Sequence, residues 1–399
     1  MGFLLALSCA LILYGTLYPF SFSFGAQEKS VLSLLTASAH SYVSRGDTIA
    51  NVILFLPFGF FAMQRVLSRV PRPIRLIFVV IAGAAFSIGI ECAQSRLPGR
   101  AVSIYDIAAN TAGALFGAVM GWKDWRGKLS KLQIDSRRPA MFPLMLLGAW
   151  LGSLLLPFVP TLDVHNIKNA LKPLFFEGFS PLDALRSFIV TMVACRLILT
   201  LARSGRFRTA LAFLPLGVVA VKPFIIGGRV SRAEIAGTLL GIAVWLYMQA
   251  RTFSGDSAAA RGRHSLHDIS GLGRMRLNTG ILAFLLMAQI VIQELTPFVF
   301  NSSPGFFSFI PFGDFLKRIT VGNILQFAER IFLYGALLWL LVKTGMNLRF
   351  SLIFSVVFLT GIEITQMFMA GHVSDITNPL LAVILGLFLY FLDIRDEGG

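Results

Sequence analysis

This chain contains a succession of apolar runs, each close to the length that crosses a lipid bilayer. The first four lie at 1–20, 47–67, 76–94 and 105–122. A helix needs about 20 mostly apolar residues to span the hydrocarbon core. Hydrophobic residues make up 56% of the 399 residues and charged residues only 14%, whereas about a quarter are charged in soluble proteins. The sequence therefore predicts an all-α polytopic membrane protein.

Similar landmarks recur three times along the chain in the same order. The helix ending TLYPF returns as LLLPF and ELTPF, and the glycine turns LPGRAVS, IGGRVS and MAGHVS each separate the third helix of a unit from the fourth. Self-similarity of this kind along a chain indicates an architecture built from repeated units. We predict about 12 transmembrane helices as three four-helix repeats, at 1–125, 141–250 and 277–393, with a cytoplasmic linker at 251–276.

Lys and Arg residues set the predicted orientation. The loops 65–75, 123–139, 202–208, 251–276 and 343–349 hold 20 of them. The alternate loops hold 10 and are predicted to lie outside, at 20–46, 95–104, 158–182, 227–233, 299–321 and 369–375. Because cytoplasmic loops carry the excess of basic residues, both termini are predicted to be cytoplasmic. The net charge of +15 lies in these loops, without a basic helix face, so nucleic-acid binding is not expected.

Neither a metal nor a cofactor is expected. The cysteines Cys9, Cys92 and Cys195 lie inside apolar runs, where thiols pack as small hydrophobes. His264 and His267 stand in a polar loop without the four placed ligands of a structural zinc site.

Polar residues gather where the third apolar run meets the fourth. Glu91 and Gln94 are three apart, on one helix face, and Glu91 lies about 12 Å along the axis from Gly99. Intramembrane ionisable groups commonly mark functional sites, which predicts an outward-facing polar cleft. In the alternative interpretation, the same groups only join helices, and Ser103 with Asp106 only caps one. The candidates are Asn51, Glu91, Gln94, Arg100, Ser103, Asp106 and Asn110.

The third unit repeats part of this cluster, and the middle unit changes it. Reuse of the glutamate and glutamine pair favours a role beyond packing. In the middle unit Lys222 stands near the place of the pair, while Arg229, Ser231 and Glu234 are kept, so we expect its activity to be lost or changed. The third unit offers Asn323 for Asn51, Glu363 for Glu91, Gln366 for Gln94, His372 for Arg100 and Thr377 for Asp106.

Glu329 and Arg330 are adjacent charges inside a predicted helix of the third unit. Neighbouring side chains on a helix point about 100° apart. We therefore expect each of them to pair with another helix.

The motifs YPF, NVILFLPFG, IECAQ and GRxxSxxDxxxN together resemble the VanZ-like family, whose namesake is associated with low-level resistance to the glycopeptide teicoplanin. The first unit carries the full pattern, the third carries it in part, and the middle one is degenerate. The resemblance implies a fold and a cell-envelope context rather than a mechanism, and it implies a location in a bacterial inner membrane. It implicates the seven candidates of the first unit.

Four functions are compatible with these features. The favoured one is binding of a cell-envelope or glycopeptide-like amphiphile, in contact with the lipid bilayer and with a consequence for antibiotic resistance. The alternatives are a proton- or cation-coupled transporter, a membrane enzyme acting on a lipid-linked substrate with Glu91 as acid or base, and a structural scaffold. Catalysis is less favoured, since no histidine accompanies Ser103.

Overall fold

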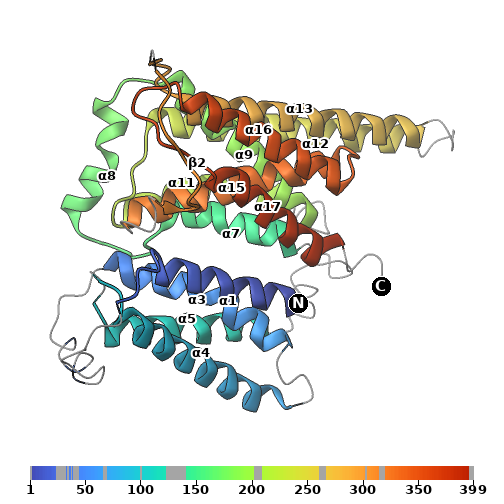
Figure 1. The fold of residues 1–399 in the computed structure, drawn as a ribbon. Helices are drawn as coiled ribbons and strands as arrows, with labels where there is room; N and C mark the ends of the chain where they lie inside the picture. Colours follow the sequence, from blue (N-terminus) through green and yellow to red (C-terminus); the bar gives the residue numbers. More distant parts are fainter. Residues whose placement is uncertain are drawn as a thin grey trace. The chain divides into compact units, whose positions relative to one another are not determined.

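The computed structural model describes the chain in segments, and helices dominate them (Figure 1). Among the residues that the structure describes, six helices are long and apolar enough to cross a membrane, judged by length and composition, and four further apolar helices are shorter. This confirms the predicted all-α polytopic class. The described residues are 2–23, 33, 36, 38, 45–65, 70–98, 101–122, 141–201, 209–259, 267–301, 303–313 and 320–394.

Twelve helices of the described residues follow one another in the order expected from the apolar runs. Their arrangement as three repeated units stays a prediction. They are α1 (Gly2–Leu17), α3 (Arg45–Arg65), α4 (Arg72–Gln94), α5 (Ile104–Trp122), α7 (Met141–Leu155), α9 (Pro181–Leu201), α11 (Leu214–Val221), α12 (Arg232–Ala259), α13 (His267–Leu295), α15 (Val321–Lys343), α16 (Leu348–Gln366) and α17 (Thr377–Leu389).

Short elements complete the described structure. A 3-10 turn, η1 (Lys222–Phe224), follows α11, and a π-helical turn, η2 (Tyr390–Ile394), follows α17. The strands β1 (Phe307–Ser308) and β2 (Ser374–Asp375) pair in parallel.

A further helix, α8 (Val164–Phe176), occupies a segment that we expected to be a loop. The Asp163 side chain caps it by accepting a hydrogen bond of 3.0 Å from the main-chain nitrogen of His165. At 13 residues it is too short to span a bilayer. Figure 1 shows it running across the direction of the longer helices of its unit, at one end of them. Lys168, Lys172 and Phe176 are exposed along it.

The predicted linker is partly helical. Residues 251–259 continue α12 and residues 267–276 begin α13, while 260–266 lie outside the described residues. Once a helix is nucleated, each added residue gains a hydrogen bond. The two long helices therefore extend beyond their apolar parts.

The chain divides into two compact units, 1–125 with 313–324 and 126–312 with 325–399. In the first, α5 packs closely against α3. A Cβ atom at Gly113 would collide with the main-chain oxygen of Val52, and one at Gly117 with that of Leu56. The GxxxG spacing thus permits a close helix contact, as expected. In the second unit, Gly237 brings α12 against α9 in the same way.

The three matched helix endings share one geometry. The peptide bond before each proline is cis, and the following phenylalanine is left-handed, with φ of 61° at Phe20, 55° at Phe158 and 60° at Phe298. The nitrogen of each phenylalanine donates to the oxygen three residues before it, at 2.7 to 2.9 Å. Bulky residues rarely adopt positive φ. The recurrence therefore supports the interpretation of these endings as copies of one motif.

Candidate functional site

Glu91 and Gln94 lie in the last turn of α4 and are buried, Glu91 at 1% exposure. Glu91 Oε2 accepts a hydrogen bond of 2.9 Å from the main-chain nitrogen of Ser103. Gln94 Nε2 donates one of 2.9 Å to the main-chain oxygen of Thr16. The pair therefore ties the end of α4 to the start of α5 and to the end of α1.

The other predicted residues of the first unit do not take part in the hydrogen bonds of Glu91 and Gln94 through their side chains. Asn110 Nδ2 donates to Ser87 Oγ at 2.9 Å, and both side chains are buried. Ser103 Oγ accepts from the main-chain nitrogen of Asp106 at 3.4 Å, as a helix cap does. Asn51 is half-buried on α3. Arg100 lies outside the described residues, so the predicted outward-facing cleft stays a prediction.

The counterpart pair in the second compact unit is placed in the same way. Glu363 Oε2 accepts from the main-chain nitrogen of Asp375 at 2.9 Å, and its Oε1 accepts from Asn378 Nδ2 at 2.6 Å. Gln366 Nε2 donates to the main-chain oxygen of Glu294 at 2.7 Å. The carboxylate again holds the start of the next helix, and the amide again holds the end of an earlier one. His372 is half-buried in the turn between α16 and β2.

One predicted correspondence is wrong. The residue whose main-chain nitrogen reaches the glutamate is 12 positions later in both copies, Ser103 after Glu91 and Asp375 after Glu363. By this measure Asn378, and not Thr377, stands where Asp106 does. The serines of the two glycine turns do not correspond, because the turn of the third unit is one residue shorter between its glycine and its serine than the turn of the first unit.

Glu294 is a buried ionisable residue that the sequence analysis missed. Its Oε1 accepts from the Tyr334 hydroxyl at 2.8 Å, and its Oε2 accepts from Arg330 at 3.2 Å. Arg330 thus pairs with α13, while Glu329 pairs with Arg186 of α9, which confirms that the adjacent charges serve different helices. The signal was present in ELTPF, where a glutamate replaces the threonine of TLYPF.

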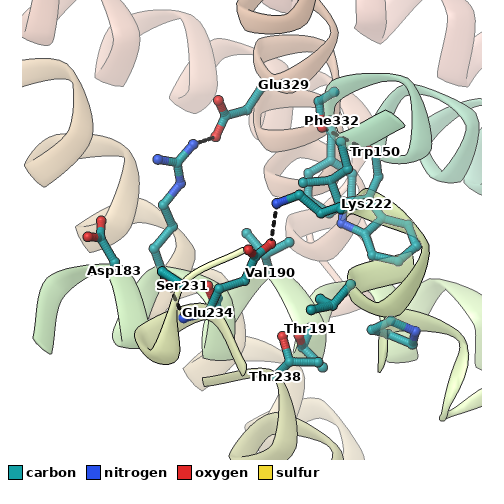
Figure 2. Close-up of a pocket in the computed structure, with 16 residues that line it drawn as sticks. Trp150, Asp183, Val190, Thr191, Lys222, Ser231, Glu234, Thr238, Glu329 and Phe332 are labelled. Carbon is teal, nitrogen blue, oxygen red and sulfur yellow. Dashed lines mark hydrogen bonds and ion pairs between the residues drawn. The ribbon is translucent and has the colours of Figure 1, made fainter. Parts of the chain in front are cut away.

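A cavity of about 270 Å³ lies within the second compact unit, between α7, α9, α11, η1, α12 and α15. Leu154, Val190, Val219 and Phe332 form its apolar walls. Its polar lining comes from hydroxyl groups, two ion pairs, one indole and the exposed carboxylate of Asp183 (Figure 2). The cavity thus has both an apolar and a strongly polar lining.

The first ion pair joins Lys222 of η1 to Glu234 of α12, with Nζ and Oε1 2.6 Å apart and both side chains largely buried. Ser231 Oγ accepts from the main-chain nitrogen of Glu234 at 3.1 Å, which repeats the cap of Ser103 on Asp106. The middle unit therefore keeps the acidic residue after its glycine turn and adds a buried cation. The second ion pair is that of Arg186 with Glu329.

Trp150 of α7 also lines the cavity. Its side chain is only 3% exposed, and its Nε1 has no hydrogen-bond partner among the described residues. Figure 2 shows the indole beside Lys222. A buried indole N–H usually has an acceptor. The indole nitrogen is itself covered at the wall of the cavity, so it is an unsatisfied donor among the described residues.

Comparison with known protein families gives a match over part of the chain. The family model described as VanZ/LLP1 matches residues 3–123, which confirms the resemblance for the N-terminal segment. No curated protein and no solved structure gave a significant match. The three-unit arrangement is left as a prediction, because the match covers only the first of the expected units.

Proposed function

We propose that this multi-pass membrane protein, whose N-terminal segment is VanZ-like, binds the polar part of a cell-envelope amphiphile in the cavity of its second compact unit. The observation that carries the proposal is the ion pair of Lys222 with Glu234, which lies largely buried in the lining of the cavity. Charged groups inside membrane proteins are costly and are commonly retained for function.

The size of the cavity limits the ligand. A volume of about 270 Å³ lies near the lower end of small-molecule pockets, which run from about 300 to 1,000 Å³. It accommodates a headgroup or one small polar moiety, with any apolar tail outside. A glycopeptide antibiotic is far larger, so a direct antibiotic-binding role in this cavity is not part of the proposal.

A structural role fits the Glu91 and Glu363 clusters better than a ligand-binding role. Both carboxylates already accept a main-chain N–H, and Glu363 accepts from Asn378 as well. These bonds fix the geometry between consecutive helices. We assign the two clusters to holding the helix ends in place, and ligand binding to the cavity.

The test is native mass spectrometry of the full-length protein purified from its membrane in mild detergent. The wild-type protein should retain a co-purifying amphiphile, and the double variant Lys222→Met with Glu234→Leu, which removes the ion pair without leaving one charge unpaired, should reduce its occupancy. The double variant Glu294→Leu with Arg330→Met is the matched control, because it removes an ion pair that does not line the cavity. Equal occupancy in the two variants, or a wild-type protein that retains no amphiphile, would refute the proposal.

A further inference from the structure

We infer that α8 is an interfacial helix, which lies in the headgroup region of the membrane and binds anionic phospholipids through Lys168 and Lys172. The helix does not line the cavity, so this lipid site is separate from the one proposed above. Three features of α8 support it: the face that the helix exposes, its direction and its charges.

The exposed face of α8 combines two lysines with large apolar side chains. At about 100° per residue, these residues fall on one side of the helix: Val164, Lys168, Lys172, Phe175 and Phe176. All of them are exposed, Phe175 at 73% and Phe176 at 85%. Apolar groups gathered on a surface indicate contact with something other than water. Lysine suits the same place, because its stem lies along apolar surface while its ammonium reaches the polar layer.

The opposite face of α8 is fixed to the rest of the second compact unit. Ala170 and Pro173 are buried on it. The main-chain oxygen of Ala170 accepts a hydrogen bond of 3.0 Å from the main-chain nitrogen of Val230, in the glycine turn of the middle unit. The basic and apolar face is therefore held outward by the packing of the other face.

The length and direction of α8 fit the surface of a bilayer. Its 13 residues make a helix about 20 Å long, whereas the hydrocarbon core is about 30 Å thick. In Figure 1 the helix runs across the direction of the longer helices of its unit, at one end of them. Because those longer helices include the candidate membrane spans, a helix across their end lies along the membrane plane. Interfacial helices lie there, with apolar residues inserted at the boundary between headgroups and acyl chains.

The charges of α8 favour an anionic partner. The carboxylates at its two ends are engaged, since Asp163 caps the helix and Glu177 pairs with Arg229 at 3.3 Å. Lys168 and Lys172 have no hydrogen bond or ion pair among the described residues. They lie one helical turn apart, so both ammonium groups can reach the phosphate layer. Each lysine near an anionic membrane surface strengthens binding about fivefold.

A second copy of the chain fits this face less well than a lipid. A two-fold contact places the same patch of both copies together, which would bring the lysines of one copy against those of the other. Like charges across an interface disfavour association. The phosphate groups of anionic lipids instead complement the lysines, while the acyl chains accept Phe175 and Phe176.

The depth of α8 is measured with a fluorophore on His165→Cys, in a cysteine-free background of the full-length protein in nanodiscs. His165 is exposed on the same side of α8, and the residues of the proposed face stay unchanged. A headgroup nitroxide should quench this probe more strongly than a nitroxide at the end of an acyl chain. Ile81→Cys is the reference, because Ile81 lies within α4, is 59% exposed and should show the reverse order. A His165→Cys probe that neither nitroxide quenches would overturn the inference, since the face would then lie in water or against protein.

The class of lipid is measured with phosphatidylglycerol and phosphatidylcholine of matched acyl chains. The nanodiscs contain equal amounts of both, and the nitroxide is placed at one acyl-chain position of either the first or the second. Quenching of the His165→Cys probe should show phosphatidylglycerol enriched at least about fivefold, the effect of one lysine near an anionic surface. The two labelled lipids should quench Ile81→Cys equally. Equal quenching at His165→Cys would overturn the recognition of anionic lipid.

The lysines are tested by the double variant Lys168→Gln with Lys172→Gln. It should abolish the enrichment of phosphatidylglycerol, while the headgroup nitroxide still quenches the probe because the apolar residues remain. Lys343→Gln with Arg349→Gln is the matched control, since it removes two exposed charges of the same compact unit outside α8. Enrichment that survives the loss of both lysines would contradict their role.

The apolar residues are tested by Phe175→Gln with Phe176→Gln. Quenching of the probe by both lipids should fall together, because the helix loses its hold on the acyl chains. Phe306→Gln is the control, since Phe306 is 88% exposed in the same compact unit outside α8. Unchanged quenching in the double variant would refute the insertion of this face into the membrane.

Discussion

Gln366 donates a hydrogen bond of 2.7 Å to the main-chain oxygen of Glu294, and so fastens the end of α16 to the end of α13. Gln94 makes the corresponding bond to Thr16 in the first compact unit. In both places the partner oxygen belongs to the helix turn that precedes a cis-proline. The amide therefore serves a helix ending whose last carbonyl groups have no partner within their own helix.

Removing this amide should destabilise the fold. Gln94→Leu leaves the Thr16 oxygen without its buried donor and should cost about 1–2 kcal/mol. Thermal unfolding of the purified protein in detergent measures the loss. Gln64→Leu is the control, because Gln64 is exposed and its bond to Gly121 is long, at 3.4 Å. Similar midpoints for the two variants would show that the Gln94 bond contributes little.

The Glu294 and Arg330 pair should show strong coupling. Glu294→Leu leaves Arg330 and the Tyr334 hydroxyl without their acceptor, and it should cost about 2–4 kcal/mol, since an unpaired charge in a protein interior is costly. Adding Arg330→Met should restore part of the loss, because the charge is then removed. Unfolding midpoints of the two single variants and the double variant form a double-mutant cycle. Strictly additive effects would argue against the pairing.

The contact between α5 and α3 should tolerate no side chain at Gly117. Gly117→Ala places a Cβ against the main chain of Leu56, which forces the helices apart at a cost of roughly 1–3 kcal/mol. Gly89→Ala is the matched control, because a Cβ at Gly89 meets nothing within 4 Å; alanine there should be neutral or slightly stabilising. Detergent-solubilised yield and unfolding midpoint report the difference, and equal behaviour of the two variants would contradict the close approach.

The predicted orientation can be tested at α8. Leu162 precedes this helix and is 85% exposed. In a cysteine-free background, Leu162→Cys should react with a membrane-impermeant maleimide added to intact cells, because its segment is predicted to lie outside. Arg349→Cys, exposed in a loop predicted to be cytoplasmic, should react only after permeabilisation. The reverse pattern would invert the topology.

Much of the fold could be predicted because the length of an apolar run and the motifs at its ends are local properties of the sequence. The helices follow the apolar runs, and the spacing of Gly113 and Gly117 predicted a close helix contact. The helix α8 escaped prediction because VHNIKNALKPLFF interrupts its apolar residues with Asn, Lys and Pro. Such an amphipathic helix of 13 residues has neither the length nor the uniform hydropathy of a membrane span.

The candidate site was harder to predict than the fold. Glu91 was predicted as a site residue because it belongs to the complete motif of the first unit. Most of the cavity is formed by the middle unit, where the motif is degenerate. Lys222 and Glu234 face each other only because the chain turns back between η1 and α12, and Trp150 comes from a helix with no polar signature. Whether an indole N–H has an acceptor depends on the packing of several helices, which no spacing in the sequence records.

The ion pair of Arg186 with Glu329 joins residues 143 positions apart. At about 5–20 residues per second, roughly 7–30 seconds of translation separate the synthesis of the two partners. During that interval α9 carries an arginine whose acceptor does not yet exist. The cavity is therefore completed late in biosynthesis, and a nascent chain that stops before α15 would present this charge to the insertion machinery or to the surrounding lipid.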